Sequence, residues 1–244
     1  MFPIRDHNPS ERTPYVTYAL MAANIVVFLF MTTSLEGDRA LALFYWDWGL
    51  VPAKVSEGMG YGGFVSSMFL HGGFMHLAGN MLFLFIFGDN LEDELGHLGF
   101  ILFYLASGLG AAGLQFAADP TSLAPMIGAS GAIAGVMGGY LLLFPRARVD
   151  VLIIFIVFFK IFPVPAWLML VVWFGLQLFN GAAGADAGVA YWAHAGGFVV
   201  GFLWVLPKWL REGGPAFWRR SQGHPDHPAA RYSRTGIPVV RRRK

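Results

Sequence analysis

The chain has 244 residues, of which 56% are hydrophobic and only 13% are charged. A soluble domain carries about 25% charged residues, so this composition excludes an ordinary soluble protein and indicates one that crosses a membrane several times. The net charge of +2 is slight, and we expect no nucleic-acid partner. The chain contains no cysteine, which excludes disulfide and thiol chemistry.

Six stretches are apolar enough, and long enough, to approach the roughly 20 residues that a bilayer-spanning helix needs. They are 15–34, 75–92, 97–117, 129–145, 165–181 and 189–207. We therefore expect an all-α membrane protein, with a six-transmembrane-helix bundle over 15–207. A polar arm, 1–14, precedes it, and a basic tail, 208–244, follows it. The arm lacks the residue order of a cleavable signal peptide, so we expect the first span to be retained.

Three segments do not fit a spanning helix. Residues 35–74 are too polar to span and too aromatic for a plain linker, and we expect them to form an outer loop. The apolar run 151–162 is only about a dozen residues long, so we expect it to lie at the membrane interface or against the bundle. The tail is rich in Pro, Gly and Arg, and we expect it to be disordered. Its HPDHP stretch, 224–228, offers at most a loose metal site.

The basic residues indicate the topology. Of the 17 Lys and Arg residues, 15 lie in the N-terminal arm, after the fourth predicted span or in the tail, whereas only Arg39 and Lys54 lie in the other loops. By the positive-inside rule both termini are then cytoplasmic. The loops expected on the outer side are 35–74, 118–128 and 182–188.

Polar side chains within spans are costly and mark functional sites. His71, His76 and Asn80 open the second predicted span, Ser130 opens the fourth, and His194 lies near the start of the sixth. Even-numbered spans all start on the same side of the membrane, so these groups share one depth, in the outer half of the bilayer. His76 and Asn80 are four residues apart and share a helix face.

Ser130 lies within the stretch GASGAIAG, at the expected start of a helix. First-turn N–H groups lack intrahelical acceptors and favour negative charge, so this hydroxyl is a candidate nucleophile beside part of an oxyanion hole. The alternative is that Ser130 is only a small packing residue, and a histidine near a span end is often an interfacial hydrogen-bonder. A metal site is disfavoured, because no HExxH motif is present and no carboxylates lie at this depth.

Glycines recur every four residues on both helices. Gly131, Gly135 and Gly139 follow Ser130, and Gly197 and Gly201 follow His194. Small residues at this spacing allow helix backbones to approach closely. We therefore expect these two glycine seams to bring His194 within hydrogen-bonding reach of Ser130, and a base of this kind activates a serine.

Taken together, these motifs resemble those of the rhomboid family of intramembrane serine proteases, over roughly residues 60–205. GASGAIAG is similar to the family's GxSG motif, which includes Gly128 and implies that Ser130 is the nucleophile. AHAGGFVVG is similar to the AHxxGxxxG motif, which implies that His194 is the general base.

Two further motifs extend the resemblance. HGGFMHLAGN is similar to the family's second-span pattern, which implies that His76 and Asn80 are oxyanion donors and that His71 has a structural or gating role. FGDNLEDELG is similar to the end of that span, which implies that Glu92 supports packing.

The chain departs from the family pattern at two places. Gly62-Gly63 stands where many members carry Trp-Arg in the first outer loop, and Ala134 stands where some carry a tyrosine beneath the catalytic histidine. We therefore expect His194 to be held by another contact, with Trp192 or at Gly197. No buried carboxylate is placed to orient His194, so a dyad is expected rather than a triad.

The resemblance implies an integral, multi-pass serine endopeptidase that needs no cofactor and cleaves transmembrane protein substrates within the lipid bilayer. We also expect a location in the cell membrane, with the site open to the outer side, as the distribution of basic residues indicates. The sequence does not indicate the oligomeric state or the natural substrate. Two alternatives remain open: a non-catalytic rhomboid-like binding or quality-control protein, and a transporter, although no internal repeat supports the transporter.

Overall fold

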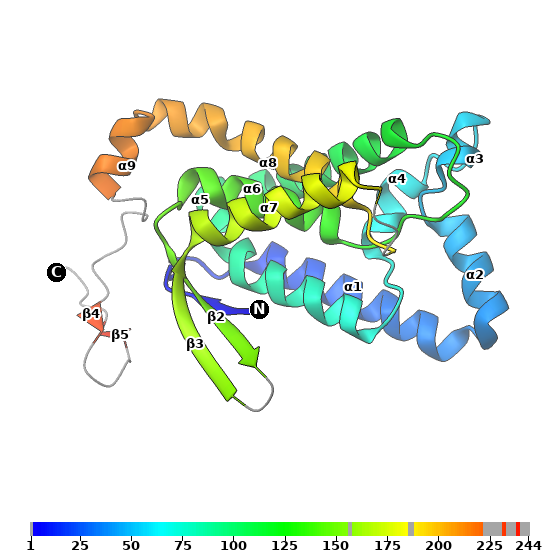
Figure 1. Ribbon diagram of the computed structural model, residues 1–244, viewed down its shortest axis with the longest axis horizontal. Helices are drawn as coiled ribbons and strands as arrows, with labels where there is room; N and C mark the ends of the chain where they lie inside the picture. Colours follow the sequence, from blue (N-terminus) through cyan, green and yellow to red (C-terminus); the bar gives the residue numbers. More distant parts are fainter. Residues whose placement is uncertain (1, 156–157, 185–187, 222–230, 233–237, 240–244) are drawn as a thin grey trace.

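The computed structural model describes residues 2–155, 158–184, 188–221, 231–232 and 238–239. Helices dominate this part of the chain (Figure 1). In chain order the elements are β1 (Phe2–Asp6), α1 (Tyr15–Ser34), α2 (Gly37–Trp48), α3 (Pro52–Ser56), α4 (Gly63–Ser66), the short 3₁₀ helix η1 (Ser67–Phe69), α5 (Phe74–Ala118), α6 (Ser130–Leu143), β2 (Arg148–Phe155), β3 (Phe158–Pro165), α7 (Ala166–Ala182), α8 (Tyr191–Arg211), α9 (Pro215–Ser221), β4 (Arg231–Tyr232) and β5 (Pro238–Val239).

The centre of the bundle is α6. Nearly all of its residues are buried, and it packs against α5, α7 and α8. Its glycines allow close approach of neighbouring helices, while its large apolar side chains, such as Met137 and Tyr140, are fully buried in the core. The outer helices are different, since α1 and α7 expose large apolar side chains such as Leu29, Phe30, Val172 and Phe179. Large exposed apolar side chains on outer helices are suited to contact with lipid.

A break at Gly96 divides α5 into two helical arms. Gly96 has φ +69° and ψ 164°, a conformation that residues with a side chain rarely adopt. The two arms fold back on one another, as their contacts with α6 show. A Cβ built at Gly139 of α6 would lie 3.1 Å from Leu91 on the first arm and 3.2 Å from Phe103 on the second. In a straight helix these two residues would be about 18 Å apart. The arms correspond to the second and third predicted spans.

The described part of the chain contains two helices, α1 and α5, that are long and apolar enough to cross a membrane by length and composition. Two more apolar helices, α6 and α7, are shorter.

The segment between α1 and α5 forms short helices at one end of the bundle (Figure 1). Ser66 Oγ donates to the Trp48 carbonyl at 2.6 Å, and Tyr45 Oη donates to the His71 carbonyl at 3.0 Å. Gly63 lies directly against the Gly49 backbone, where a Cβ would not fit. These contacts anchor the loop in which Gly62-Gly63 replaces the family's Trp-Arg.

The expectation of an all-α fold was wrong in one respect, because the described residues of the run 151–162 belong to two strands, β2 and β3. β1, β2 and β3 form an antiparallel sheet in that order, with Arg148 opposite Pro165 and Phe2 opposite Leu152. The run is rich in Val, Ile and Phe, which favour strands. The arm 1–14 supplies the third strand, β1, which no pattern in the sequence predicted.

An ion-pair cluster fixes β1 to β2. Asp150 accepts from Arg5 Nε at 2.7 Å and lies 2.8 Å from His7 Nε2. Partial burial opposes ionisation, but Arg5 and His7 together hold the pKa of Asp150 below its ordinary value. The sheet lies at the opposite end of the bundle from α2 and α3 (Figure 1).

The last predicted span was expected to end at 207, but α8 continues to Arg211 and α9 follows it. Trp218 Nε1 donates to the Leu142 carbonyl at 2.9 Å, and its ring contacts Trp209. The first part of the tail therefore packs against the end of α6. The HPDHP stretch lies outside the described residues.

Candidate active site

Ser130 is the first residue of α6. Gly128 precedes it with φ +128° and donates its N–H to the Ser67 carbonyl at 2.9 Å. A Cβ at Gly128 would lie 2.8 Å from His76 Nε2 and 3.5 Å from Ser130 Oγ. Only glycine fits this turn, both because of its φ and because two polar side chains converge on it.

His194 contacts Ser130 directly. Its Nε2 lies 2.8 Å from Ser130 Oγ, which is a normal hydrogen-bond distance. The start of α8 is held to α5, because Ala193 N–H donates to Gln115 Oε1 at 3.2 Å. Both Ser130 and His194 are only partly buried, so the pair can be reached from outside the bundle.

Close backbone packing brings the two helices together. A Cβ at Gly197 would overlap the Gly131 carbonyl oxygen, and one at Gly201 would overlap that of Gly135. Gly139 was expected to pack against α8 together with Gly131 and Gly135, but it faces Leu91 and Phe103 of α5. Its place against α8 is taken by Gly138, which lies against the Phe198 carbonyl.

His76 and Asn80 lie on the first arm of α5. His76 Nδ1 accepts a long 3.4 Å hydrogen bond from the Gly72 N–H, so its Nε2 carries the proton and is directed toward Gly128. Asn80 is buried, and its Nδ2 has no hydrogen-bond partner among the described residues. Both groups therefore keep a free donor, as do the first-turn amides of α6.

His71 and Glu92 occupy supporting positions. The His71 ring is fully buried and packs edge-on against the His76 ring at 5.1 Å, and within the described residues its nitrogens have no hydrogen-bond partner. Glu92 is 2% exposed and accepts from the N–H groups of Val16 and Thr17 and from Thr17 Oγ1. It also contacts His97. Glu92 therefore ties the start of α1 to α5.

The residues that hold His194 were not predicted from the sequence. Gln177 Oε1 lies 2.9 Å from His194 Nδ1, and the Trp173 ring lies 5.6 Å from the imidazole. Both residues come from α7. Trp192 was expected to hold His194, but its ring packs against Gly181 of α7. One signal was available: Gln177 is a polar residue inside the fifth predicted span, where such residues usually have a function.

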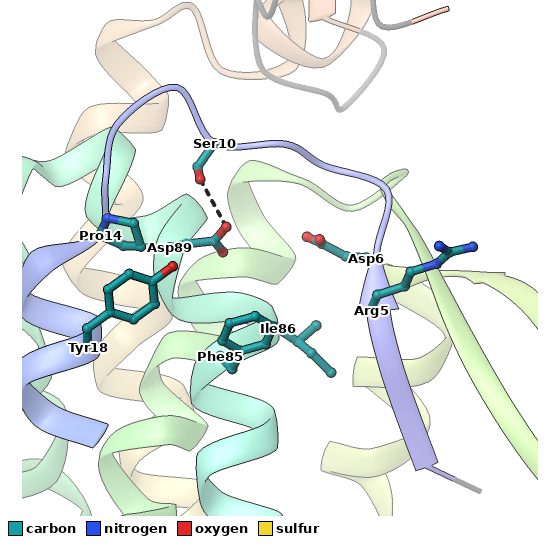
Figure 2. Close-up of a pocket in the computed structure, with 8 residues that line it drawn as sticks. All are labelled: Arg5, Asp6, Ser10, Pro14, Tyr18, Phe85, Ile86 and Asp89. Carbon is teal, nitrogen blue, oxygen red and sulfur yellow. Dashed lines mark hydrogen bonds between the residues drawn. The ribbon is translucent and has the colours of Figure 1, made fainter. Parts of the chain in front are cut away.

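A second polar site is formed where the N-terminal arm meets α1 and the first arm of α5 (Figure 2). It is a small pocket lined by Arg5, Asp6, Ser10, Pro14, Tyr18, Phe85, Ile86 and Asp89. Ser10 Oγ donates to Asp89 at 3.0 Å, and Tyr140 Oη donates to Asp6 at 2.6 Å. Tyr140 is ten residues beyond Ser130 on α6, about 15 Å along the axis, so this pocket is separate from the Ser130 site. Within the described residues no cluster of three metal-ligating side chains is present.

Comparisons with known proteins identify a matching family model and several relatives. The Rhomboid domain model matches residues 59–211. The chain is 36% identical over 157 residues to Rhomboid protein 1, mitochondrial, of Saccharomyces cerevisiae, covering 59% of this chain and 41% of that protein. It is 34% identical over 155 residues to RHOMBOID-like protein 4 of Arabidopsis thaliana, covering 64% and 36%.

A third relative, Rhomboid-like protein 11, chloroplastic, of Arabidopsis thaliana, is 41% identical over 73 residues, covering 30% of this chain and 26% of that protein. The matched part of the chain spans less than half of the length of each of these three relatives. The domain match covers more than half of the chain and contains Ser130, His194, His76 and Asn80. The chain therefore belongs to the rhomboid family, whose members are integral membrane proteins and generally intramembrane serine proteases.

Proposed function

We propose that this chain is an intramembrane serine endopeptidase that hydrolyses peptide bonds in or near transmembrane helices of other membrane proteins. The observation that carries the proposal is the 2.8 Å contact between Ser130 Oγ and His194 Nε2 at the start of a buried helix. In this proposal Ser130 is the nucleophile and His194 is the general base.

The dyad acts in two steps. His194 Nε2 takes the Ser130 hydroxyl proton while Oγ attacks the peptide carbonyl carbon, and the same nitrogen then gives that proton to the leaving amine. The C–N bond breaks and an ester on Ser130 remains. In the second step water loses its proton to His194, attacks the ester and releases the new carboxyl end, which restores the Ser130 hydroxyl.

The negative charge of the tetrahedral intermediates needs donors that are already in position. The Ser130 N–H, His76 Nε2–H and Asn80 Nδ2 are three donors available near the nucleophile's helix end. Preorganised donors of this kind each contribute about 10²–10³ in rate. Two of the three are side chains, so their contributions can be tested by mutation.

The substrate must lose its helical structure at the cleavage site. In a helix each carbonyl accepts an intrahelical hydrogen bond and is shielded by side chains. The exposed His76 ring and the partly exposed dyad are on the side from which an unwound segment would enter. We propose six membrane crossings, formed by α1, the two arms of α5, α6, α7 and α8, with both termini cytoplasmic and the site in the outer half of the bilayer.

The test uses the full chain purified in detergent and a model protein with one transmembrane helix. We expect wild type to cleave this protein, and Ser130→Ala and His194→Ala to lose cleavage while keeping the wild-type melting temperature. Leu203→Ala, at an exposed apolar position of α8, is the matched control and should cleave normally. If wild type bound the helix without cleaving it, the non-catalytic rhomboid-like alternative would be favoured. If Ser130→Ala still cleaved it, another residue would be the nucleophile.

A further inference from the structure

We propose that Gln177 is a positioning residue, whose side-chain oxygen holds His194 in the tautomer that can accept the Ser130 proton. This inference rests on the proposed function. Gln177 Oε1 lies 2.9 Å from His194 Nδ1, and Ser130 Oγ lies 2.8 Å from His194 Nε2. The three side chains form a continuous chain of hydrogen bonds from α7 through α8 to α6.

The direction of each hydrogen bond follows from the amide of Gln177. Its Nε2 is 3.4 Å from the Trp173 carbonyl oxygen, which can only accept. The NH₂ group must therefore face Trp173, and the carbonyl oxygen must face His194. If the amide were rotated by 180°, Gln177 Oε1 would face the Trp173 carbonyl oxygen, and the Gln177 NH₂ group would face His194 Nδ1.

This orientation determines the protonation of the imidazole. Because Gln177 Oε1 accepts, His194 Nδ1 must carry the proton, and Nε2 is left free to accept from Ser130. The other tautomer would place a proton on Nε2 and remove the base. The role parallels that of the acid in a serine-protease triad, which accepts from Nδ1–H and so holds the imidazole in the tautomer whose Nε2 is free.

Gln177 differs from a triad acid because it is uncharged. It is 8% exposed, and the neighbouring Trp173 ring lies along the imidazole. A carboxylate at this depth would be costly without a partner, whereas an amide oxygen orients the ring at little cost. The titratable group that interacts with His194 from another element is His76 on α5. Together Trp173 and Gln177 hold the His194 ring, as the tyrosine that some family members carry at the position of Ala134 is expected to do.

The test compares three variants of the full chain in one detergent. Gln177→Met keeps the length of the side chain but cannot accept strongly, and Gln177→Glu restores an acceptor with a charge. Leu176→Met is the matched control, because Leu176 is the adjacent α7 residue and is 52% exposed. The readouts are kcat, KM and the pH profile of cleavage, the melting temperature, and ¹⁵N NMR of the His194 ring, assigned by its loss in His194→Ala.

We expect Gln177→Met to lower kcat roughly 10- to 100-fold, as loss of an orienting partner does elsewhere, with little change in KM. Its ¹⁵N spectrum should lose the pattern of a protonated Nδ1 and a bare Nε2. Gln177→Glu should recover cleavage, with the acidic limb of the pH profile moved to higher pH, because the carboxylate stabilises the imidazolium. Leu176→Met should match wild type.

Wild-type kcat in Gln177→Met, or an unchanged tautomer pattern, would overturn the positioning role. Equal losses in both Gln177 variants, together with lower melting temperatures and an unchanged tautomer, would also overturn it and indicate packing alone. The NMR readout is independent of turnover. A wild-type protein with the expected tautomer but no cleavage would therefore contradict the proposed function and not the role of Gln177 in holding the imidazole.

Discussion

Adding one methyl group to the glycine seam should disable the site without touching a catalytic atom. In Gly197→Ala the new Cβ would overlap the Gly131 carbonyl oxygen. A carbon and an oxygen need more than 3 Å between them, so the α6 and α8 backbones would have to separate by about 1 Å. His194 lies one turn before Gly197, and Ser130 is next to Gly131, so the separation falls directly on the dyad.

The magnitudes follow from this displacement. The 2.8 Å Ser130–His194 hydrogen bond would stretch to about 3.8 Å, which is no longer a hydrogen bond. A displacement of 1 Å costs about 10² in rate, and overpacking costs about 1–3 kcal/mol. For a chain of this size that is roughly 2–12 °C in melting temperature.

The assay measures the melting temperature and the cleavage rate of a model transmembrane substrate in one detergent. The matched control is Gly113→Ala on α5, where a Cβ would meet no atom within 4 Å. It should cleave normally and melt at or slightly above the wild-type temperature, because alanine favours helix. If Gly197→Ala behaved like Gly113→Ala, the seam would not be what sets the Ser130–His194 distance, and the reasoning would be refuted.

Three further predictions concern other parts of the molecule. Asn80→Ala should lower kcat about 10²–10³-fold with KM little changed, and steady-state kinetics showing the reverse would make Asn80 a binding residue. Glu92→Gln should destabilise the fold by about 1–3 kcal/mol, because Glu92 accepts three hydrogen bonds at the start of α1; an unchanged melting temperature would contradict this. Burial raises the pKa of Asp6 from 3.8 to about 8, although the Tyr140 hydroxyl opposes this. The folded protein then binds a proton that the unfolded chain releases, so stability should fall as pH rises between about 4 and 8. Melting scans at pH 5 and 8 should show a smaller fall for Asp6→Asn, and equal falls would refute the assignment.

Much of the site could be predicted because its residues lie in short motifs with a fixed helical spacing. Ser130 at a helix start, His76 and Asn80 four residues apart, and glycines at intervals of four each have a local physical meaning. The expected order of the spans then predicts that these groups share one depth. The structure brings Ser130 and His194 into contact, as the seams suggested.

The rest could not be predicted because it depends on contacts between distant segments. Gln177 looks like one polar residue in an apolar helix until α7 packs beside α8 and brings it to His194. The run 151–162 is too short to distinguish a strand from an interfacial helix by its apolar pattern. Its partner, β1, comes from residues some 150 positions away, and a pairing of that kind leaves no local signal.

The most direct test of the central claim is to treat the purified full chain with a fluorophosphonate probe, which phosphonylates activated serines with loss of fluoride, and to map the adduct by mass spectrometry. We predict one adduct, on Ser130, that is lost in His194→Ala and retained in Leu203→Ala. An unlabelled wild-type protein that remains folded, or an adduct on another serine, would contradict the claim that Ser130 is a nucleophile activated by His194.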